Sequence, residues 1–168
     1  MISSTRAAGT TPPPKSPSKP VRILAIDYGR RRIGLAISDE LGLTAQPLAT
    51  MQRKNRRADM RRLSDLAKKN GVSAILVGSP VHLSGLQSEM AEEAARFTAR
   101  LRDELRLPVE LRDERLTSWE AQQMAAELGL GKNPDIDALA AAVLLREYLD
   151  EQHSRKKSQR PVHARCEK

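Results

Sequence analysis

The chain has 168 residues, of which 39% are hydrophobic and 30% charged, and its formal net charge is +8. These values are typical of one globular domain with its own core. The apolar runs are too short to span a membrane, and the single cysteine, Cys166, excludes an internal disulfide and a cysteine-built zinc site. Because no apolar signal core stands at the N-terminus, we expect a cytoplasmic protein without membrane contact.

Most of the positive charge lies near the two ends of the chain. Residues 1–20 hold three basic residues and no acid, and residues 151–168 hold six basic against two acidic residues, which leaves +1 for residues 21–150. We expect 1–20, rich in Pro, Ser and Thr, to be a disordered extension and 151–168 to be a basic tail. The high net charge is therefore weak support for nucleic-acid binding by the domain at 21–150.

Hydrophobic patterning predicts alternating strands and helices within this domain. Apolar runs predict strands, and apolar residues at helical spacing predict helices. A capping box at Thr117-x-x-Glu120 marks the start of one further helix. The predicted strands cover 21–28, 33–39, 46–51, 74–78 and 109–114, and the other helices cover 56–69, 86–106 and 135–150.

This order of elements predicts an α/β fold built on a five-stranded mixed sheet flanked by helices. The first three strands form an antiparallel meander, and the two later strands, reached by helical crossovers, lie parallel to the first. Ligands gather at the carboxyl ends of parallel strands in such sheets. Asp27 stands at one such end, and Asp113 and Glu114 stand at another.

Asp27 ends a run that is apolar on every residue, which is the pattern of a strand buried on both faces. A charge there is costly unless it is solvated, paired or bound to a metal. The alternative is that Asp27 and Gly29 form a turn between hairpin strands. For Asp113 and Glu114 the simpler explanation is surface ion pairing, and strand alternation does not choose between them.

Asp135 and Asp137 follow Asn133-Pro134 at the start of the last predicted helix. Acidic residues are favoured in a first helical turn, which explains Asp135. Asp137 begins an apolar face, where a charge needs a partner. Carboxylates that converge on one point stay ionised together around a cation, and oxygen ligands suit Mg²⁺ or Mn²⁺.

Two basic clusters stand within the nearly neutral domain. The first is Arg30-Arg31-Arg32, and the second covers residues 53–62, with six bases against one acid. Either cluster is explained by a solvated turn or helix face, or by a phosphate-contacting surface. Because only four residues are aromatic, we expect nucleic acid to be held by phosphates and shape rather than by an extended stacking platform.

Several short motifs, taken in order, resemble the YqgF/RuvX family over residues 21–150. Each motif is weak alone, and their succession makes the match specific. The sequence has Gly78-Ser79-Pro80 where the family usually has Gly-Leu-Pro. The matching motifs are Ile26-Asp27-Tyr28-Gly29, Arg32-Ile33-Gly34-Leu35-Ala36, Ser38-Asp39, Val77-Gly78, Asp113-Glu114-Arg115-Leu116-Thr117-Ser118 with Glu120-Ala121, and Ile136-Asp137-Ala138-Leu139-Ala140-Ala141.

The resemblance implies a ribonuclease H-like fold related to RuvC resolvases, and a bacterial nuclease that matures the 5′ end of 16S rRNA from its precursor. It implies a site of Asp27, Glu114 and Asp137 that holds Mg²⁺ or Mn²⁺. Two alternatives stay open, namely a nuclease for branched DNA such as Holliday junctions and a non-catalytic RNA-binding module of ribosome assembly. The chain is expected to be a monomer or a homodimer. The expected RNA-binding residues are Arg30, Arg31, Arg32, Arg53, Lys54, Arg56 and Arg57.

Overall fold

The computed structural model describes residues 22–80, 89–114, 123, 126–127, 129 and 135–158. At Pro80, Asp113 and Glu114, and at 156–157, it describes the backbone only. The predictions for the N-terminal extension 1–20, for the helix from Thr117 and for residues 159–168 lie outside these ranges.

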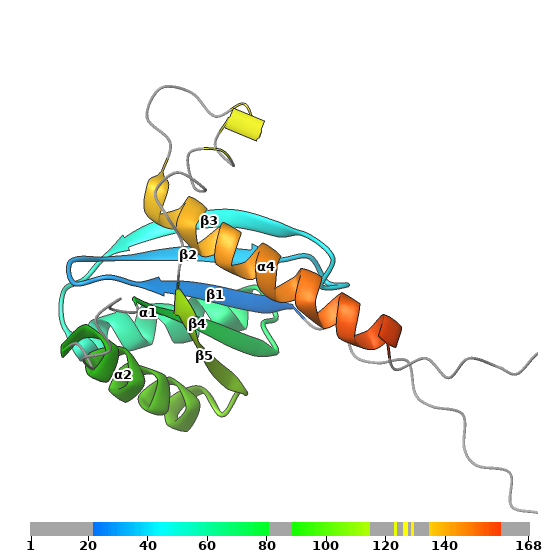
Figure 1. Ribbon diagram of the computed structural model, residues 1–168. Coiled ribbons are helices and arrows are strands. Elements are labelled where there is room, and N and C mark those ends of the chain that lie inside the picture. Colours follow the sequence, from blue (N-terminus) through cyan, green and yellow to red (C-terminus); the bar gives the residue numbers. More distant parts are fainter. Residues whose placement is uncertain are drawn as a thin grey trace, which may run out of the picture.

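One five-stranded sheet organises the fold, with strand order β3-β2-β1-β4-β5 (Figure 1). Strand β1 is antiparallel to β2, and β2 is antiparallel to β3. Strand β4 is parallel to both β1 and β5. The predicted mixed sheet is therefore confirmed. The strands are β1 (Ile23–Tyr28), β2 (Arg32–Ser38), β3 (Ala45–Gln52), β4 (Ala74–Pro80) and β5 (Val109–Glu114).

Helices cover both faces of this sheet. Helices α1 (Arg56–Lys69) and α2 (Glu89–Leu105) lie on one face, and α4 (Ile136–Ser158) lies across the other (Figure 1). The central strand β1 sends Leu24 and Ile26 into the core under α1 and α2, and Ile23 and Ala25 into the core under α4. This double burial explains why β1 is apolar at almost every position.

Helix α4 is longer than predicted, because it ends at Ser158 and not near residue 150. The first part of the predicted basic tail is thus helical. No Pro or Gly interrupts the chain before Pro161. The extra turns also have contacts with their surroundings, since Glu151 forms an ion pair with Arg112 of β5 and lies 4.0 Å from Arg155 one turn later. No helix among the described residues is long and apolar enough to cross a membrane.

Candidate acidic site and nucleic-acid interface

Asp27 lies at the carboxyl end of the central strand and not in the turn that follows. Within the sheet it is paired with Gly34 of β2 and with Gly78 of β4. Side chains alternate along a strand, so Asp27 is on the same face as Ile23 and Ala25, which pack under α4. Glycine at both paired positions means that neither neighbouring strand places a side chain directly beside Asp27.

The turn after β1 depends on Gly29. Its N–H donates a 3.1 Å hydrogen bond to the carbonyl oxygen of Arg32. A Cβ at Gly29 would lie only 2.6 Å from that same oxygen, so the tight turn excludes a side chain. The expected turn former is therefore Gly29, and Asp27 belongs to the strand.

The start of α4 lies directly against β2 at Gly34. A Cβ at Gly34 would lie 1.9 Å from the carbonyl oxygen of Asp137, which no side chain could tolerate. Because Gly34 is the β2 partner of Asp27, this close approach brings the Asp137 backbone to the position beside Asp27. Asp27 and Asp137 therefore lie near each other although they are far apart in the sequence.

Asp135 ends the loop before α4 and caps this helix. Its carboxylate accepts a 3.3 Å hydrogen bond from the Ala138 N–H and a second from the Thr50 hydroxyl, and its carbonyl accepts from Leu139 N–H at 3.0 Å. Asp135 therefore stands at the start of α4 as predicted, but as the cap that precedes Ile136 and not as a residue of the first turn. The neighbouring Asn133 lies outside the described residues.

Asp137 has the partner that its position requires. Oδ2 of Asp137 lies 2.9 Å from Nε of Arg32, the first residue of β2. The Asp137 side chain is 29% exposed and that of Arg32 is 57% exposed. One predicted metal ligand and one predicted phosphate-binding residue are therefore joined in an ion pair at the edge of the sheet.

Strand β5 brings residues 113 and 114 to the same edge. The backbone of Glu114 is paired with that of Pro80 at the carboxyl end of β4. At position 112 the guanidinium of Arg112 lies 5.3 Å from the ring centre of Tyr148 on α4. Position 114 belongs to the same alternating set as 112, and position 113 belongs to the other set.

Only part of the expected acidic cluster can be located. Among the side chains that the structure describes, no group of three or more Asp, Glu, His or Cys residues could hold a metal ion. The side chains of Asp113 and Glu114 lie outside that description. The structure therefore brings together Asp27 and Asp137, and it places the third expected residue, Glu114, by its backbone alone.

A basic groove of about 750 Å³ begins at the β1–β2 turn, on the opposite side of the sheet from Asp137. Both predicted basic clusters contribute to it, and they meet there because β3 runs back beside β2 and delivers the second cluster to the turn. Arg53 N–H donates a 2.9 Å hydrogen bond to the Arg31 carbonyl at this junction. The basic residues of the groove are Arg30, Arg31, Arg53, Lys54, Arg56 and Arg96.

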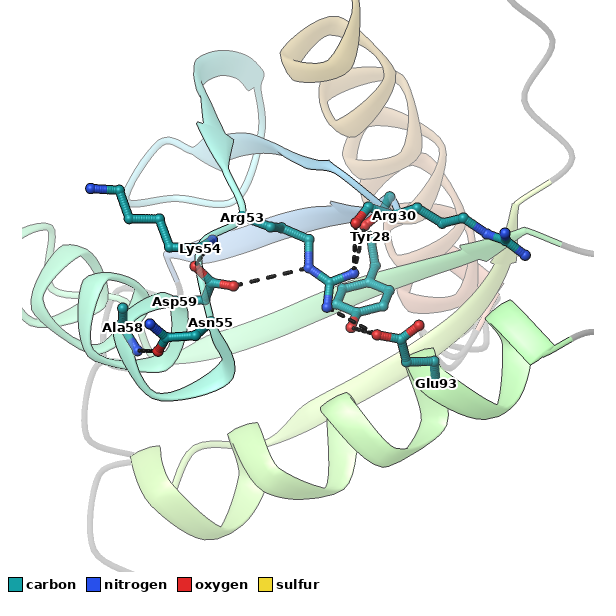
Figure 2. A network of polar contacts seen from close by, with 9 residues as sticks. Tyr28, Arg30, Arg53, Lys54, Asn55, Ala58, Asp59 and Glu93 are labelled. Carbon is teal, nitrogen blue, oxygen red and sulfur yellow. Dashed lines mark hydrogen bonds and ion pairs between the residues drawn. The ribbon is translucent and has the colours of Figure 1, made fainter.

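Arg53 differs from the other basic residues because its side chain is only 18% exposed and donates to protein groups (Figure 2). Nη1 donates to the carbonyls of Gly29 and Arg30 at 3.0 and 3.2 Å, and Nη2 donates to Glu93 of α2 at 2.9 Å. The guanidinium also lies 4.7 Å from the ring centre of Tyr28. Arg53 thus connects the turn after Asp27 to helix α2.

Tyr28 and Glu93 complete this network, and no residue pattern indicates their pairing. The Tyr28 hydroxyl donates a 2.9 Å hydrogen bond to Glu93. Burial, together with this hydrogen bond, raises the pKa of Tyr28 to about 12. The hydrogen bonds from Arg53 and then from Tyr28 lower the pKa of Glu93. The network therefore holds an ionised carboxylate beside a neutral phenol at neutral pH.

The fold and these motifs match one family. A family model described as "RuvX: Holliday junction resolvase" matches residues 21–151. The chain belongs to the RuvX family. A RuvX relative from Koribacter versatilis (strain Ellin345) is 45% identical over 132 residues, which cover 77% of this chain and 86% of the relative. Another from Geobacillus kaustophilus (strain HTA426) is 44% identical over 135 residues, covering 77% and 98%. Both are named "Putative pre-16S rRNA nuclease".

Solved structures agree with this RuvX assignment at the level of the fold. RuvC from T. thermophilus in complex with a Holliday junction substrate has a TM-score of 0.56 at 19% identity, covering 79% of this chain and 96% of RuvC. The fowlpox virus resolvase in complex with Holliday junction DNA has a TM-score of 0.50 at 13% identity, covering 79% and 99%. The predicted RuvX family, its nuclease class and the RuvC-like ribonuclease H fold are thus confirmed.

Proposed function

We propose that this RuvX protein is a cytoplasmic, divalent-metal-dependent endonuclease that processes the 5′ end of the 16S rRNA precursor. Relatives that are 45% and 44% identical and cover most of the domain bear the name of that activity. The structural observation that supports a nuclease site most directly is the contact between Gly34 and Asp137. Through this contact two acidic residues from distant parts of the chain lie side by side at the carboxyl edge of the sheet.

The proposed metal ligands are Asp27, Asp137 and Glu114, with Mg²⁺ or Mn²⁺ as the ion. All three donors are carboxylates, which suit these hard cations. The glycines on either side of Asp27 keep neighbouring strand side chains away from it. We choose Glu114 over Asp113 because side chains alternate along a strand. Position 114 therefore lies on the same face of β5 as Arg112, which contacts Tyr148 of α4.

A bound ion would supply an activated water and would stabilise the charge that develops on the phosphate and on the leaving oxygen. The chain itself supplies the carboxylates that hold the ion, with Glu114 and Asp137 orienting the attacking water. Arg53 acts on the site indirectly, because its hydrogen bonds to Gly29 and Arg30 fix the turn that follows Asp27.

The basic groove is the proposed binding surface for the RNA backbone. Arg30, Arg31, Lys54 and Arg56 have exposed positions along it, and Arg57 follows on α1. Phosphate contacts of this kind position a nucleic acid without reading its sequence, and they weaken steeply as the salt concentration rises. Arg32 lies on the other side of the turn, at Asp137, where it can contact a phosphate next to the acidic site.

The decisive experiment measures cleavage of a precursor RNA that carries the 5′ extension of 16S rRNA, with Mg²⁺ or Mn²⁺ supplied. We expect Asp27→Asn to abolish cleavage and to leave the melting temperature unchanged. Asp65→Asn, at an exposed position of α1, is the matched control and should cleave like the original protein. Equal cleavage by Asp27→Asn and by the original protein would sink the proposed site.

A second candidate substrate is a four-way DNA junction, which the description of the matching family favours. Offering labelled precursor RNA and a labelled junction in the same reaction decides between the two, since the preferred substrate is consumed first. The third possibility is a non-catalytic RNA-binding module. It predicts RNA binding that neither EDTA nor Asp27→Asn changes, and no cleavage of either substrate.

A further inference from the structure

A second, smaller hollow of about 230 Å³ lies between α1 and α2, on the face of the sheet opposite Asp27 and Asp137. We call it the α1–α2 pocket. Its apolar lining comes from Met60 of α1, Phe97 of α2 and the ring of Tyr28. It adjoins the basic groove, because the two hollows share a set of lining residues. The shared residues are Arg53, Arg56, Asp59, Glu93 and Arg96.

The α1–α2 pocket carries cationic side chains that the fold does not otherwise use. Arg57 of α1 and Arg100 of α2 are exposed and form no ion pair with any described residue. Among the residues that the structure describes, Arg96 pairs only with Glu92, one turn earlier on the same exposed helix face, at 3.4 Å. By contrast, the acidic residues Asp59 and Glu93 both lie against Arg53. Glu104 of α2 is the third acidic residue of the lining, so five arginines face three carboxylates and the net charge of the pocket is positive.

Guanidinium groups over an apolar floor suit a nucleotide. Arginine binds phosphate through paired hydrogen bonds, and an aromatic side chain or a guanidinium plane stacks on a base. The ring of Tyr28 is already covered, with Phe97 at 4.4 Å between ring centres and Arg53 at 4.7 Å. Met60 is also buried, so the half-buried Phe97 is the apolar surface left for a base. A hollow of this size admits one base and not a stacked series.

We propose that the α1–α2 pocket binds one unpaired nucleotide of a single-stranded segment whose backbone follows the basic groove. The inference rests on the proposed function, because Arg30 and Arg31 of the groove lie in the turn that directly follows the strand carrying Asp27. A strand that leaves the acidic site at Arg32 would pass Arg31 and Arg30 in the turn and enter the groove, which adjoins the pocket. The substrate is accordingly one with an unpaired stretch beside the cleaved bond, and Arg96, Arg100 and Phe97 are its additional binding residues.

The test measures binding alone, with the full-length protein in EDTA and a fluorescein-labelled oligouridine decamer as the probe. The double variant Arg96→Ala/Arg100→Ala should weaken binding by about tenfold or more. Arg61→Ala/Arg62→Ala is the matched control, because it removes the same charge from exposed positions of α1 outside both hollows, and it should change the affinity by less than about threefold. Phe97→Leu, which keeps an apolar side chain under Tyr28, should weaken binding by about fivefold or more.

Two further probes, an abasic decamer and a polyglutamate decamer, distinguish a nucleotide from an acidic peptide as the occupant of the pocket. A decamer with abasic sugars should bind more weakly than oligouridine to the original protein and should be insensitive to Phe97→Leu. Equal losses of affinity in the two double variants would overturn the proposed role of the pocket. Equal binding of the abasic and normal decamers would also overturn it. Tight binding of a polyglutamate decamer that Arg96→Ala/Arg100→Ala abolishes also overturns it, in favour of an acidic peptide. This binding test measures no cleavage. Cleavage by Asp27→Asn would therefore refute the proposed function and would leave the result on nucleotide binding in the pocket unaffected.

Discussion

Nε of Arg32 lies 2.9 Å from Oδ2 of Asp137, so a salt bridge joins the start of β2 to the first turn of α4. Arg32 lies two residues before Gly34, where the α4 backbone touches the sheet. The cation of this pair is part of the Arg30–Arg32 run, and its anion is a proposed metal ligand. A positive side chain and the proposed metal ion would therefore compete for the same carboxylate.

This competition predicts that Arg32→Gln binds Mn²⁺ more tightly than the original protein does. A half-exposed ion pair contributes about 1 kcal/mol or less, so the gain should be about two- to fivefold in the dissociation constant. Isothermal titration of Mn²⁺ into the full-length protein measures it. Arg31→Gln, the exposed neighbour, is the control and should change the constant little. Weaker Mn²⁺ binding by Arg32→Gln would show that the arginine supports the site and does not compete with the ion.

Gly34→Ala should destabilise the protein by about 3 kcal/mol, because the new Cβ would meet the Asp137 carbonyl at 1.9 Å and push α4 off the sheet. Urea denaturation followed by circular dichroism measures the change. Thr50→Ala is a useful comparison, since it removes only the hydroxyl contact to Asp135 at the same end of α4 and should cost about 1 kcal/mol. A Gly34→Ala protein of unchanged stability would mean that α4 does not dock at Gly34 as described.

Arg53→Ala should lower the free energy of unfolding by about 2–3 kcal/mol, because the carbonyls of Gly29 and Arg30 and the carboxylate of Glu93 lose their shared donor. Arg56→Ala, three residues later on the exposed surface, should cost about 0.5 kcal/mol or less. If the two variants have the same stability, Arg53 belongs with the exposed basic residues of the groove and not with the support of the turn.

Glu93 predicts a specific dependence of stability on pH. Hydrogen bonds from Arg53 and Tyr28 lower its pKa in the folded protein below the ordinary value of 4.5. The unfolded state therefore takes up the proton first, so the contribution of Glu93 is present above about pH 4.5 and is lost as the pH falls through the folded pKa.

The measurement compares the original protein with Glu93→Gln across that range. At pH 7 the variant should be less stable by about 1 kcal/mol, and the difference should shrink as the pH falls below 4.5. Glu92→Gln, which removes only an exposed pair with Arg96 one turn away, should be nearly neutral at both pH values. A difference for Glu93→Gln that does not vary with pH would contradict the ionised pairing.

Much of the fold could be predicted from the sequence because burial dictates local residue patterns. The run Ile23–Ile26 is apolar since β1 is covered on both faces, and the alternation of strands with amphipathic helices implies parallel pairing of β1, β4 and β5. The prediction that α4 ends near residue 150 is wrong because residues 151–158 are polar. Charge composition indicated a tail, whereas helix formation there needs only the absence of a breaker and partners such as Arg112.

The sequence by itself determined the order of the elements, the family motifs and the identity of the acidic and basic residues. Only the tertiary structure decided which of these residues meet. Sheet register pairs Asp27 with Gly34, and helix docking then brings Asp137 to Gly34 and to Arg32. The tertiary structure also distinguishes Arg53 from the exposed arginines around it, because Arg53 donates hydrogen bonds to Glu93 and to the turn carbonyls. Residue patterns report the local environment of each segment, whereas such contacts depend on how distant segments pack, and no local pattern encodes a distance between them.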